Sequence, residues 1–230
     1  MTKERFNSNY FAMCDFIHNN EQIVNDLKNE SNFFNRNLIL SRVPKKYWQY
    51  QWDRISSDLG HNDYNHDGIT TISNYLNDID AMKDSGKGLY IYGGHGTSKT
   101  TTAIIILRKA MEHFHTGYYL HFHELIEFVT SSWKDETKKN FWEYIIQKID
   151  FLVVDDIARN FKMNERESFV IDKLFVFRSN NNLPTILTTN LSTDDMGNLL
   201  GESILSLFKE NVHEVQFIGE DVRAKCLPKK

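Results

Sequence analysis

Two short runs of residues carry groups that bind phosphate and divalent metal. The first, Gly93-Gly94-His95-Gly96-Thr97-Ser98-Lys99-Thr100, matches the phosphate-binding loop G-x-x-x-x-G-K-[ST] except that Ser98 replaces the second required glycine. In such a loop, backbone N–H groups and a helix N-terminus bind phosphate, so we predict that Lys99 contacts the terminal phosphates and Thr100 holds Mg²⁺. The predicted nucleotide-binding residues are Gly93, Gly94, His95, Gly96, Thr97, Ser98, Lys99, Thr100 and Thr101.

The second run, Phe151-Leu152-Val153-Val154-Asp155-Asp156, places two carboxylates after four apolar residues. This pattern predicts a buried strand with acids at its tip, where Asp155 holds Mg²⁺ and Asp156 orients the attacking water. Asn190 ends the next predicted strand, and its amide can hydrogen-bond the γ-phosphate or the water. The alternatives are solvated acids at a strand end and an asparagine that forms a turn.

The elements that must position these groups alternate regularly from residue 89 onward. Apolar runs separated by helical stretches, including a helix from Thr101 to His115, predict a parallel sheet covered by helices on both faces. Ligands of such sheets bind at the carboxyl ends of the strands, which is where both runs lie. The predicted strands are 89–92, 118–122, 150–155, 184–189 and 213–218.

Composition limits the remaining classes of protein. The formal net charge of −4 gives no general attraction to DNA, so nucleic acid would need a local patch or an assembly. Cys14 and Cys226 form no C-x-x-C pair, which excludes a zinc module built on cysteines. No run approaches 18 apolar residues, and no signal-peptide core follows Met1, so we expect a cytoplasmic protein without membrane contact.

The first 40 residues have apolar positions at helical spacing, which predicts one or two amphipathic helices. Pro44 interrupts this pattern. We therefore divide the chain into an N-terminal helical segment, 1–42, and a main domain, 43–230. The apolar face of the segment packs on the main domain or binds a partner, and the sequence favours neither.

Two further clusters have weaker signals. Four histidines (His113, His115, His121 and His123) lie close in sequence, but no acid or thiol completes a metal site, so solvated or core histidines are expected. A set of lysines and tryptophans (Lys134, Lys138, Lys139, Trp133 and Trp142) is a candidate patch for single-stranded DNA, with a solvated helix face as the alternative.

Together these motifs resemble the AAA+ ATPases of the DnaC/DnaI helicase-loader and IstB transposition-helper group. The resemblance covers roughly residues 43 to 225. It rests on Val43-Pro44-Lys45-Lys46-Tyr47, Gly88 to Gly93, Val153 to Asp156, Arg178, Leu183-Pro184-Thr185-Ile186-Leu187-Thr188-Thr189-Asn190-Leu191-Ser192, and Gly219 to Arg223.

The resemblance implies an α/β fold of the AAA+ P-loop type, with a five-stranded parallel sheet sandwiched by helices. Residues 219–230 are too few for a helical lid, so little or no C-terminal lid is expected. The resemblance also implies an ATPase with Thr100 and Asp155 as Mg²⁺ ligands. Its catalytic residues would be Lys99, Asp155, Asp156, Asn190 (sensor 1) and Arg223 (sensor 2). The helices at 124–147 would form the insertion that such proteins use in assembly and single-strand contact.

The implied function is an ATP-binding loader of a replicative DnaB-family helicase, acting with single-stranded DNA during replication initiation and assembling into an ATP-dependent oligomer. The N-terminal segment is its candidate helicase-binding part, and a phage or mobile element its expected source. An IstB-like transposition helper and a degenerate-site adaptor of a host loader are the alternatives. Ser98 departs from the group's pattern, as do Ser203 and Leu207, which stand where arginines are usual. We therefore expect ATP binding with weak hydrolysis.

Overall fold

The computed structural model describes residues 21–132, 135–158 and 163–219. Five parallel strands form one sheet in the order β2-β3-β4-β1-β5. Each observed strand lies within two residues of its predicted bounds, so the predicted parallel sheet is confirmed. The strands are β1 (Gly88–Gly93), β2 (Gly117–His121), β3 (Phe151–Ile157), β4 (Thr185–Thr189) and β5 (Val212–Phe217).

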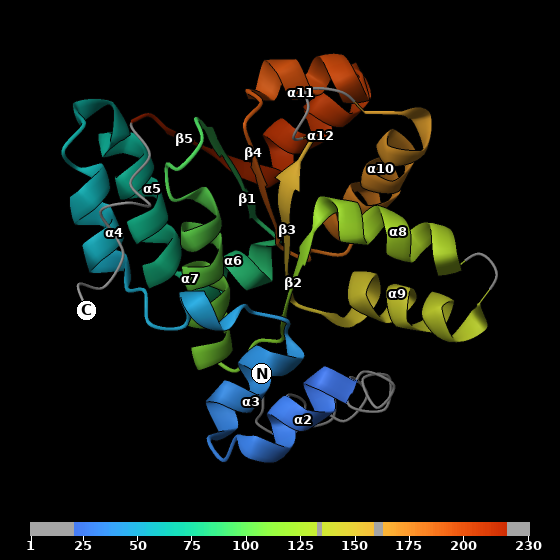
Figure 1. Ribbon diagram of the computed structural model, residues 1–230. Helices are drawn as coiled ribbons and strands as arrows, with labels where there is room; N and C mark the ends of the chain where they lie inside the picture. The colour runs from blue at the N-terminus through green and yellow to red at the C-terminus, as the bar shows by residue number, and fades with distance from the viewer. Residues whose placement is uncertain (1–20, 133–134, 159–162, 220–230) are drawn as a thin grey trace.

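One face of the sheet is covered by the helices from η1 to α7 in sequence. They are α4 (Trp52–Leu59), α5 (His66–Asn77), α6 (Ile79–Ser85) and α7 (Lys99–Glu112), with the short 3₁₀ helices η1 (Lys45–Tyr47) and η2 (Asp63–Asn65). Their apolar side chains pack with Leu89, Ile91 and Val153 of the strands. In Figure 1, α4 and α5 lie on the left of the sheet.

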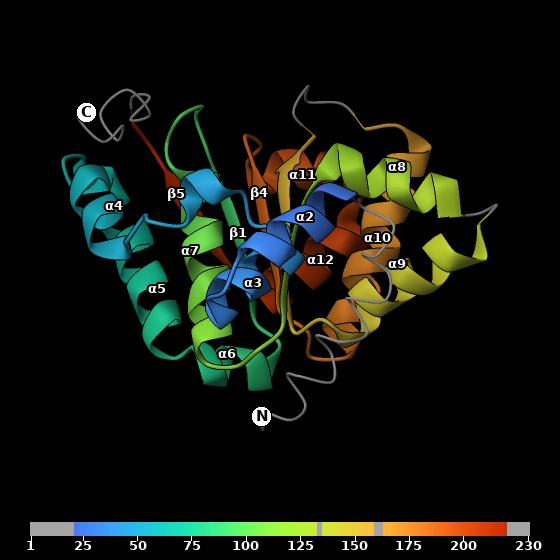
Figure 2. The ribbon, with the colours of Figure 1, turned by 60° about the horizontal axis from the view of Figure 1, so that its bottom comes forward.

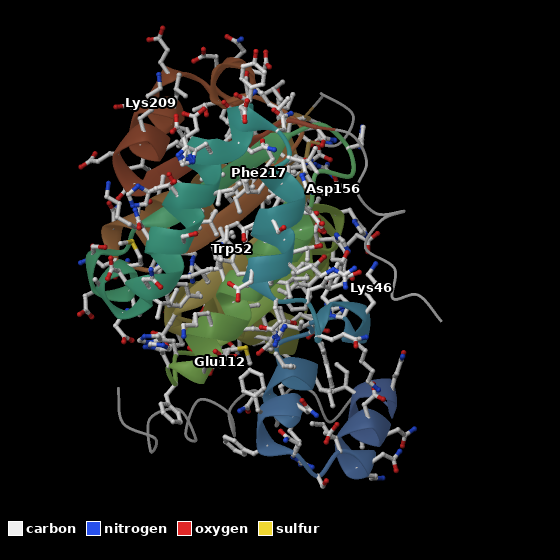
Figure 3. The ribbon with its side chains drawn as sticks, turned by 90° about the vertical axis from the view of Figure 1, so that its left-hand side faces the viewer. Lys46, Trp52, Glu112, Asp156, Lys209 and Phe217 are labelled. Atoms are coloured by element: carbon white, nitrogen blue, oxygen red, sulfur yellow. The ribbon has the colours of Figure 1, made fainter. Side chains whose placement is uncertain are left out.

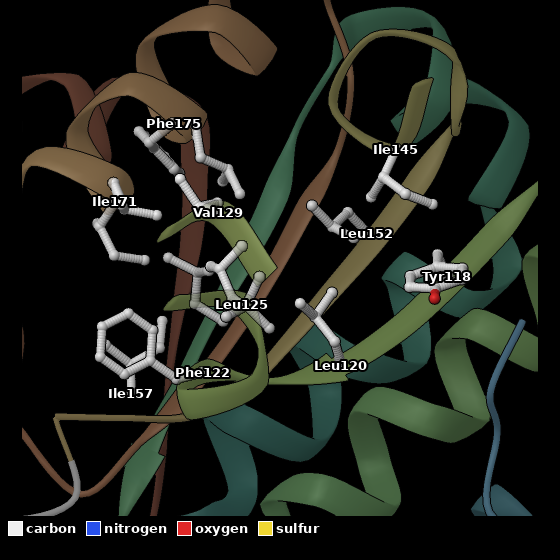
Figure 4. Close-up of a cluster of buried hydrophobic side chains, with 14 of the residues drawn as sticks. Tyr118, Leu120, Phe122, Leu125, Val129, Ile145, Leu152, Ile157, Ile171 and Phe175 are labelled. Atoms are coloured by element: carbon white, nitrogen blue, oxygen red, sulfur yellow. The ribbon is translucent and has the colours of Figure 1, made fainter. Parts of the chain in front are cut away.

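The other face carries the helices that follow β2. They are α8 (Phe122–Ser132), α9 (Glu136–Lys148), α10 (Glu165–Asn180), α11 (Thr193–Leu200) and α12 (Glu202–Asn211). Figure 4 shows the core that they form with strand residues such as Tyr118, Leu120 and Leu152. Since successive strand residues point to opposite faces, each strand contributes to both cores, and the three-layer sandwich follows.

Two helices precede the main domain, α2 (Glu21–Asn29) and α3 (Phe33–Leu40). They lie at the bottom of Figure 1 and come to the front in Figure 2. The end of α3 reaches the edge of the sheet, because Leu38 packs in one core and Leu40 in the other. Just beyond it, the Ser41 carbonyl accepts a 2.9 Å hydrogen bond from the backbone N–H of Tyr119 in the edge strand β2.

Arg178 connects α10 to the starts of β3 and β4. Its side chain is fully buried. The guanidinium donates to the carbonyls of Ile145, Ile146, Ile149, Asp150 and Pro184, and to the hydroxyl of Thr185. Burial lowers the pKa of Arg178 to about 9, and nearby Asp150 opposes this, so the group stays cationic at neutral pH. Arg178 is a structural residue that caps the end of α9.

Candidate nucleotide-binding site

The predicted phosphate-binding loop lies between the end of β1 and the start of α7. Gly93 begins it with φ +141°, and a Cβ there would come within 1.9 Å of the Phe217 carbonyl oxygen. Only glycine fits such a conformation beside the neighbouring strand. Later in the loop, the Thr97 hydroxyl donates to the Gly94 carbonyl at 2.9 Å, which closes the turn.

Ser98 stands at the N-cap of α7 in a left-handed conformation, with φ +63° and ψ +15°. Its side chain makes no capping hydrogen bond. A side chain in this region costs about 1–2 kcal/mol relative to the right-handed one, and glycine avoids the cost. The departure at Ser98 therefore has a physical consequence: the loop keeps the geometry that a glycine would allow, at the expense of local strain.

Lys99 opens α7 and bends back over the loop. Its Nζ donates to the carbonyl oxygens of Gly93 (2.9 Å) and Gly94 (2.5 Å). Lys99 and the next two residues of this 14-residue helix line the same cleft. A helix N-terminus carries partial positive charge, so this end of α7 is suited to bind an anion.

Thr100 and Asp155 form the predicted metal site. The Thr100 hydroxyl donates to Oδ1 of Asp155 at 2.8 Å. The Thr188 hydroxyl of β4 donates a short hydrogen bond to the same oxygen. A hydroxyl beside a carboxylate is the oxygen donor set that Mg²⁺ prefers, so these residues fit the ion.

The other oxygen of Asp155 is held from β2. Tyr119 donates to Oδ2 at 2.9 Å, and His121 Nδ1 lies 3.2 Å from it. Burial acts to raise the pKa of Asp155, but hydrogen bonds from His121, Thr188, Thr100 and Tyr119 outweigh it and hold that pKa below its usual value. The hydrogen bond between His121 and Asp155 also raises the pKa of His121. Asp155 is therefore an ionised carboxylate although it is buried.

The sequence motifs identify neither Tyr119 nor His121 of β2 as part of the site, and the sequence predicts His121 only as a solvated or core histidine. A usable signal was available in the predicted strands. Once β2 and β3 are parallel neighbours, His121 pairs directly with Asp155. Tyr119 lies two residues earlier and so shares the same face of the sheet.

Asp156 and Asn190 complete the set of predicted residues. Asp156 has φ +62°, and its backbone N–H donates to the Thr188 hydroxyl at 3.0 Å. Asn190 follows β4, and its Nδ2 lies 3.5 Å from Nδ1 of His95 in the loop. Asp156 and Asn190 thus both lie at the carboxyl ends of the strands, beside the loop.

Most of the predicted nucleotide-site residues line one cleft of about 710 Å³. Its lining includes loop residues from His95 to Thr101, together with Asp155, Asp156 and Asn190. The opposite wall comes from the segment before α5, with Lys46, Tyr47, Gln49, Tyr50, Arg54 and Ile55. Lys46 and Asp156 lie on the same side of the molecule in Figure 3. Sequence reasoning did not assign this wall, whose aromatic and apolar side chains suit a nucleotide base.

Several predicted positions lie elsewhere. Arg223 is outside the described residues, as are Trp133 and Lys134. Lys139 and Trp142 line a larger groove of about 1110 Å³ between α9 and α10, which contains none of the predicted nucleotide-site residues. Leu207 packs against the core under α12. In the part of the chain that the structure describes, we find no helix with the length and apolar character that a membrane span requires.

Fold and site together give this chain an AAA+-like α/β domain with a candidate nucleotide-binding cleft. A comparison with protein-family models finds no match. Among curated proteins, the chain is similar to the replicative helicase loader DnaI of Bacillus subtilis, with 26% identity over 111 residues. This region is 48% of the chain and 35% of DnaI, so the chain matches about a third of the length of that relative.

Solved structures support the same fold. The crystal structure of the DnaC helicase loader superposes with a TM-score of 0.64 at 22% identity, covering 76% of this chain and 99% of that one. The replication initiator DnaA bound to AMPPCP and single-stranded DNA gives a TM-score of 0.57 at 17% identity, covering 68% and 47%. The chain thus has a DnaC-like AAA+ fold, as its motifs predicted.

Proposed function

We propose that this protein is an ATP-binding helicase loader that assembles on a replicative DnaB-family helicase and helps to place it on single-stranded DNA. The observation that carries the proposal is the cleft in which Lys99, Thr100, Asp155, Asp156 and Asn190 meet at the start of α7. The similarity to DnaI and the DnaC-like fold favour a loader over a transposition helper.

Within this proposal each residue has a defined task. The α7 N-terminus and Lys99 bind the phosphates of ATP, and Tyr47 and Tyr50 contact the base from the opposite wall. Thr100 and Asp155 hold Mg²⁺, which neutralises phosphate charge when bound. Asp156 orients a water toward the γ-phosphate, and Asn190 senses that phosphate from the tip of β4.

ATP serves in this scheme as an assembly signal more than as a fuel. The γ-phosphate contacts groups from β1, β3 and β4 together, so ATP and ADP stabilise different states of the domain. The strained Ser98 and the core-packed Leu207 both favour slow hydrolysis. The same two features favour a second candidate function, a degenerate-site adaptor that joins a host loader which supplies the missing arginine.

Co-purification tests the proposal. Tagged full-length protein is mixed with a DnaB-family helicase in the presence of a non-hydrolysable ATP analogue, ADP or no nucleotide. We expect capture with the analogue and little without it, and we expect Lys99→Ala to abolish both nucleotide binding and the nucleotide effect. Nucleotide affinity that is unchanged in Lys99→Ala would refute the site, and duplex DNA binding without helicase capture would favour the transposition helper.

A second arm tests the N-terminal segment, 1–42, which we propose as the helicase-binding part. Because Leu38 and Leu40 belong to the cores of the main domain, the deletion must stop before α3. A variant lacking residues 1–30 removes α2 and keeps α3. We expect it to bind ATP normally and to lose helicase capture; normal capture would place the helicase contact elsewhere.

A further inference from the structure

Tyr119 contacts two separate parts of the molecule. Its backbone N–H donates to the Ser41 carbonyl at 2.9 Å, at the outer edge of β2. Its hydroxyl donates to Oδ2 of Asp155 at 2.9 Å, inside the nucleotide site. The side chain is 3% exposed. One buried residue therefore connects the end of the N-terminal segment to the predicted Mg²⁺ ligand.

A second connection runs parallel to the first. Arg42 donates to Oε1 of Glu124 at 3.1 Å, and Oε2 of Glu124 accepts from the backbone N–H of His121 at 3.1 Å. His121 Nδ1 in turn lies 3.2 Å from Oδ2 of Asp155. Both connections begin at adjacent residues, Ser41 and Arg42, and both end on the same carboxylate oxygen.

The two oxygens of Asp155 have different neighbours. Oδ1 faces the Thr100 and Thr188 hydroxyls, and Oδ2 faces Tyr119 and His121. Because the donors of β2 hold Oδ2, the carboxylate is fixed with Oδ1 toward Thr100, which is the side that would face a cation. A buried carboxylate depends strongly on such donors, and outer hydrogen bonds of this kind orient metal ligands.

We propose that Tyr119 is a positioning residue for Asp155 and couples the N-terminal segment to the nucleotide site. The inference rests on the proposed function, since it concerns the Mg²⁺ requirement of nucleotide binding. Coupling between two sites is reciprocal. Mg²⁺ and ATP bound at Asp155 therefore stabilise the contact at Ser41, and a partner bound to α2 and α3 changes the concentration of Mg²⁺ that nucleotide binding needs.

The first test measures binding of a fluorescent ATP analogue to the full-length protein as Mg²⁺ is titrated. Loss of an outer hydrogen bond to a metal ligand costs about 10–100-fold in metal affinity. We expect the Mg²⁺ midpoint of Tyr119→Phe to rise about tenfold, with little change in binding in EDTA. Tyr75→Phe is the matched control, because that buried hydroxyl donates to the Lys87 carbonyl at 2.7 Å and does not contact Asp155.

His121→Ala removes the second donor to Oδ2 of Asp155. Because the His121 side chain is half-exposed, this variant should fold and give a readout even if Tyr119→Phe folds poorly. It too should raise the Mg²⁺ midpoint. One outcome is that the wild type binds Mg²⁺ and nucleotide together while both variants keep its Mg²⁺ midpoint. That result would overturn this inference and leave the proposed function standing. A wild type that shows no Mg²⁺-dependent nucleotide binding would overturn the proposed function, and the inference with it.

Hydrogen exchange tests the coupling itself. The Tyr119 amide is protected by its bond to Ser41, so we expect Mg²⁺ and the ATP analogue to slow its exchange in the wild type. The same ligands should have no such effect in Tyr119→Phe, which keeps the amide but lacks the hydroxyl. An equal response in the two proteins, or none in the nucleotide-bound wild type, would show that Tyr119 does not connect these sites.

Discussion

The Thr100 hydroxyl donates a 2.8 Å hydrogen bond to Oδ1 of Asp155, so the two predicted Mg²⁺ ligands meet although 55 residues separate them. The strand order explains this contact. β4 lies between β1 and β3, and Thr188 of β4 donates to the same Asp155 oxygen. The start of α7 is thus joined through Asp155 to β3 and β4.

Ser98→Gly should stabilise the protein and strengthen nucleotide binding. Glycine adopts φ +63° without the steric cost that serine carries, although it loses more backbone entropy on folding. We expect a gain of about 0.5–1 kcal/mol in the free energy of unfolding, measured in urea. The dissociation constant of an ATP analogue should fall in the same variant.

Ser57→Gly is the matched control for this prediction. Ser57 is exposed within α4, where glycine weakens the helix, so this variant should lose about 0.5 kcal/mol. Opposite signs at the two serines would tie the gain to the backbone conformation of Ser98. A loss of stability in Ser98→Gly would contradict the account.

Arg178→Lys should destabilise the protein strongly. Lysine keeps the charge but offers three donors from one point, and it cannot match the six acceptors around the planar guanidinium. Buried carbonyls left without a donor make the loss about 3 kcal/mol or more in urea unfolding. Arg166→Lys, at an exposed position in the first turn of α10, should change stability by less than about 0.5 kcal/mol. Similar losses in both variants would show that the carbonyl contacts are not the cause.

Asp80→Asn should remove a pH-dependent contribution to stability. Asp80 contacts His113 Nδ1 at 2.9 Å and His115 Nε2 at 2.6 Å, which ties α6 to the segment after α7. The hydrogen bond from His113, followed by that from His115, lowers the pKa of Asp80. An acid with a lowered folded pKa stabilises the native state above its unfolded pKa, and this contribution is lost as the pH falls through the folded value.

The urea midpoint of Asp80→Asn should therefore lie below that of the wild type at pH 7, and the difference should shrink as the pH falls below about 4. Asp84→Asn, exposed on the same helix, should show no such narrowing. A wild-type advantage that persists unchanged in acid would mean that the Asp80 charge does not contribute.

The sheet and most of the candidate nucleotide site could be predicted from the sequence because each depends on local patterns. The apolar runs predict the strands, and the motif from Gly93 to Thr100 predicts the loop between β1 and α7. The first helix residue is Lys99, where the sequence suggested Thr101, because Ser98 already turns the chain. Its last residue is Glu112, three before the predicted end, and Phe114 beyond it has φ +62°.

What the sequence did not reveal depends on contacts between distant segments. Tyr119 and His121 have no motif, and their role becomes visible only when β2 is placed beside β3. The wall formed by Tyr50 and Arg54 likewise depends on how the segment before α5 folds across the loop. The complete burial of Arg178 could not be inferred either, since an isolated arginine in a helix is usually solvated.

The absence of the usual arginines near α12 leads to the last prediction. Leu207 packs against the core, so an arginine there would disturb packing. Ser203 is the second residue of the same helix and is the other position to restore. An arginine supplied to a neighbouring active site is typically worth about 10³–10⁵ in rate. We expect Ser203→Arg to raise ATP turnover at least about tenfold at high protein concentration, which favours the proposed assembly of subunits. Ser206→Arg, exposed on the same helix, is the control for added charge. If both variants assemble with ATP and neither hydrolyses it faster than the wild type, hydrolysis is limited by Ser98 or by another part of the site.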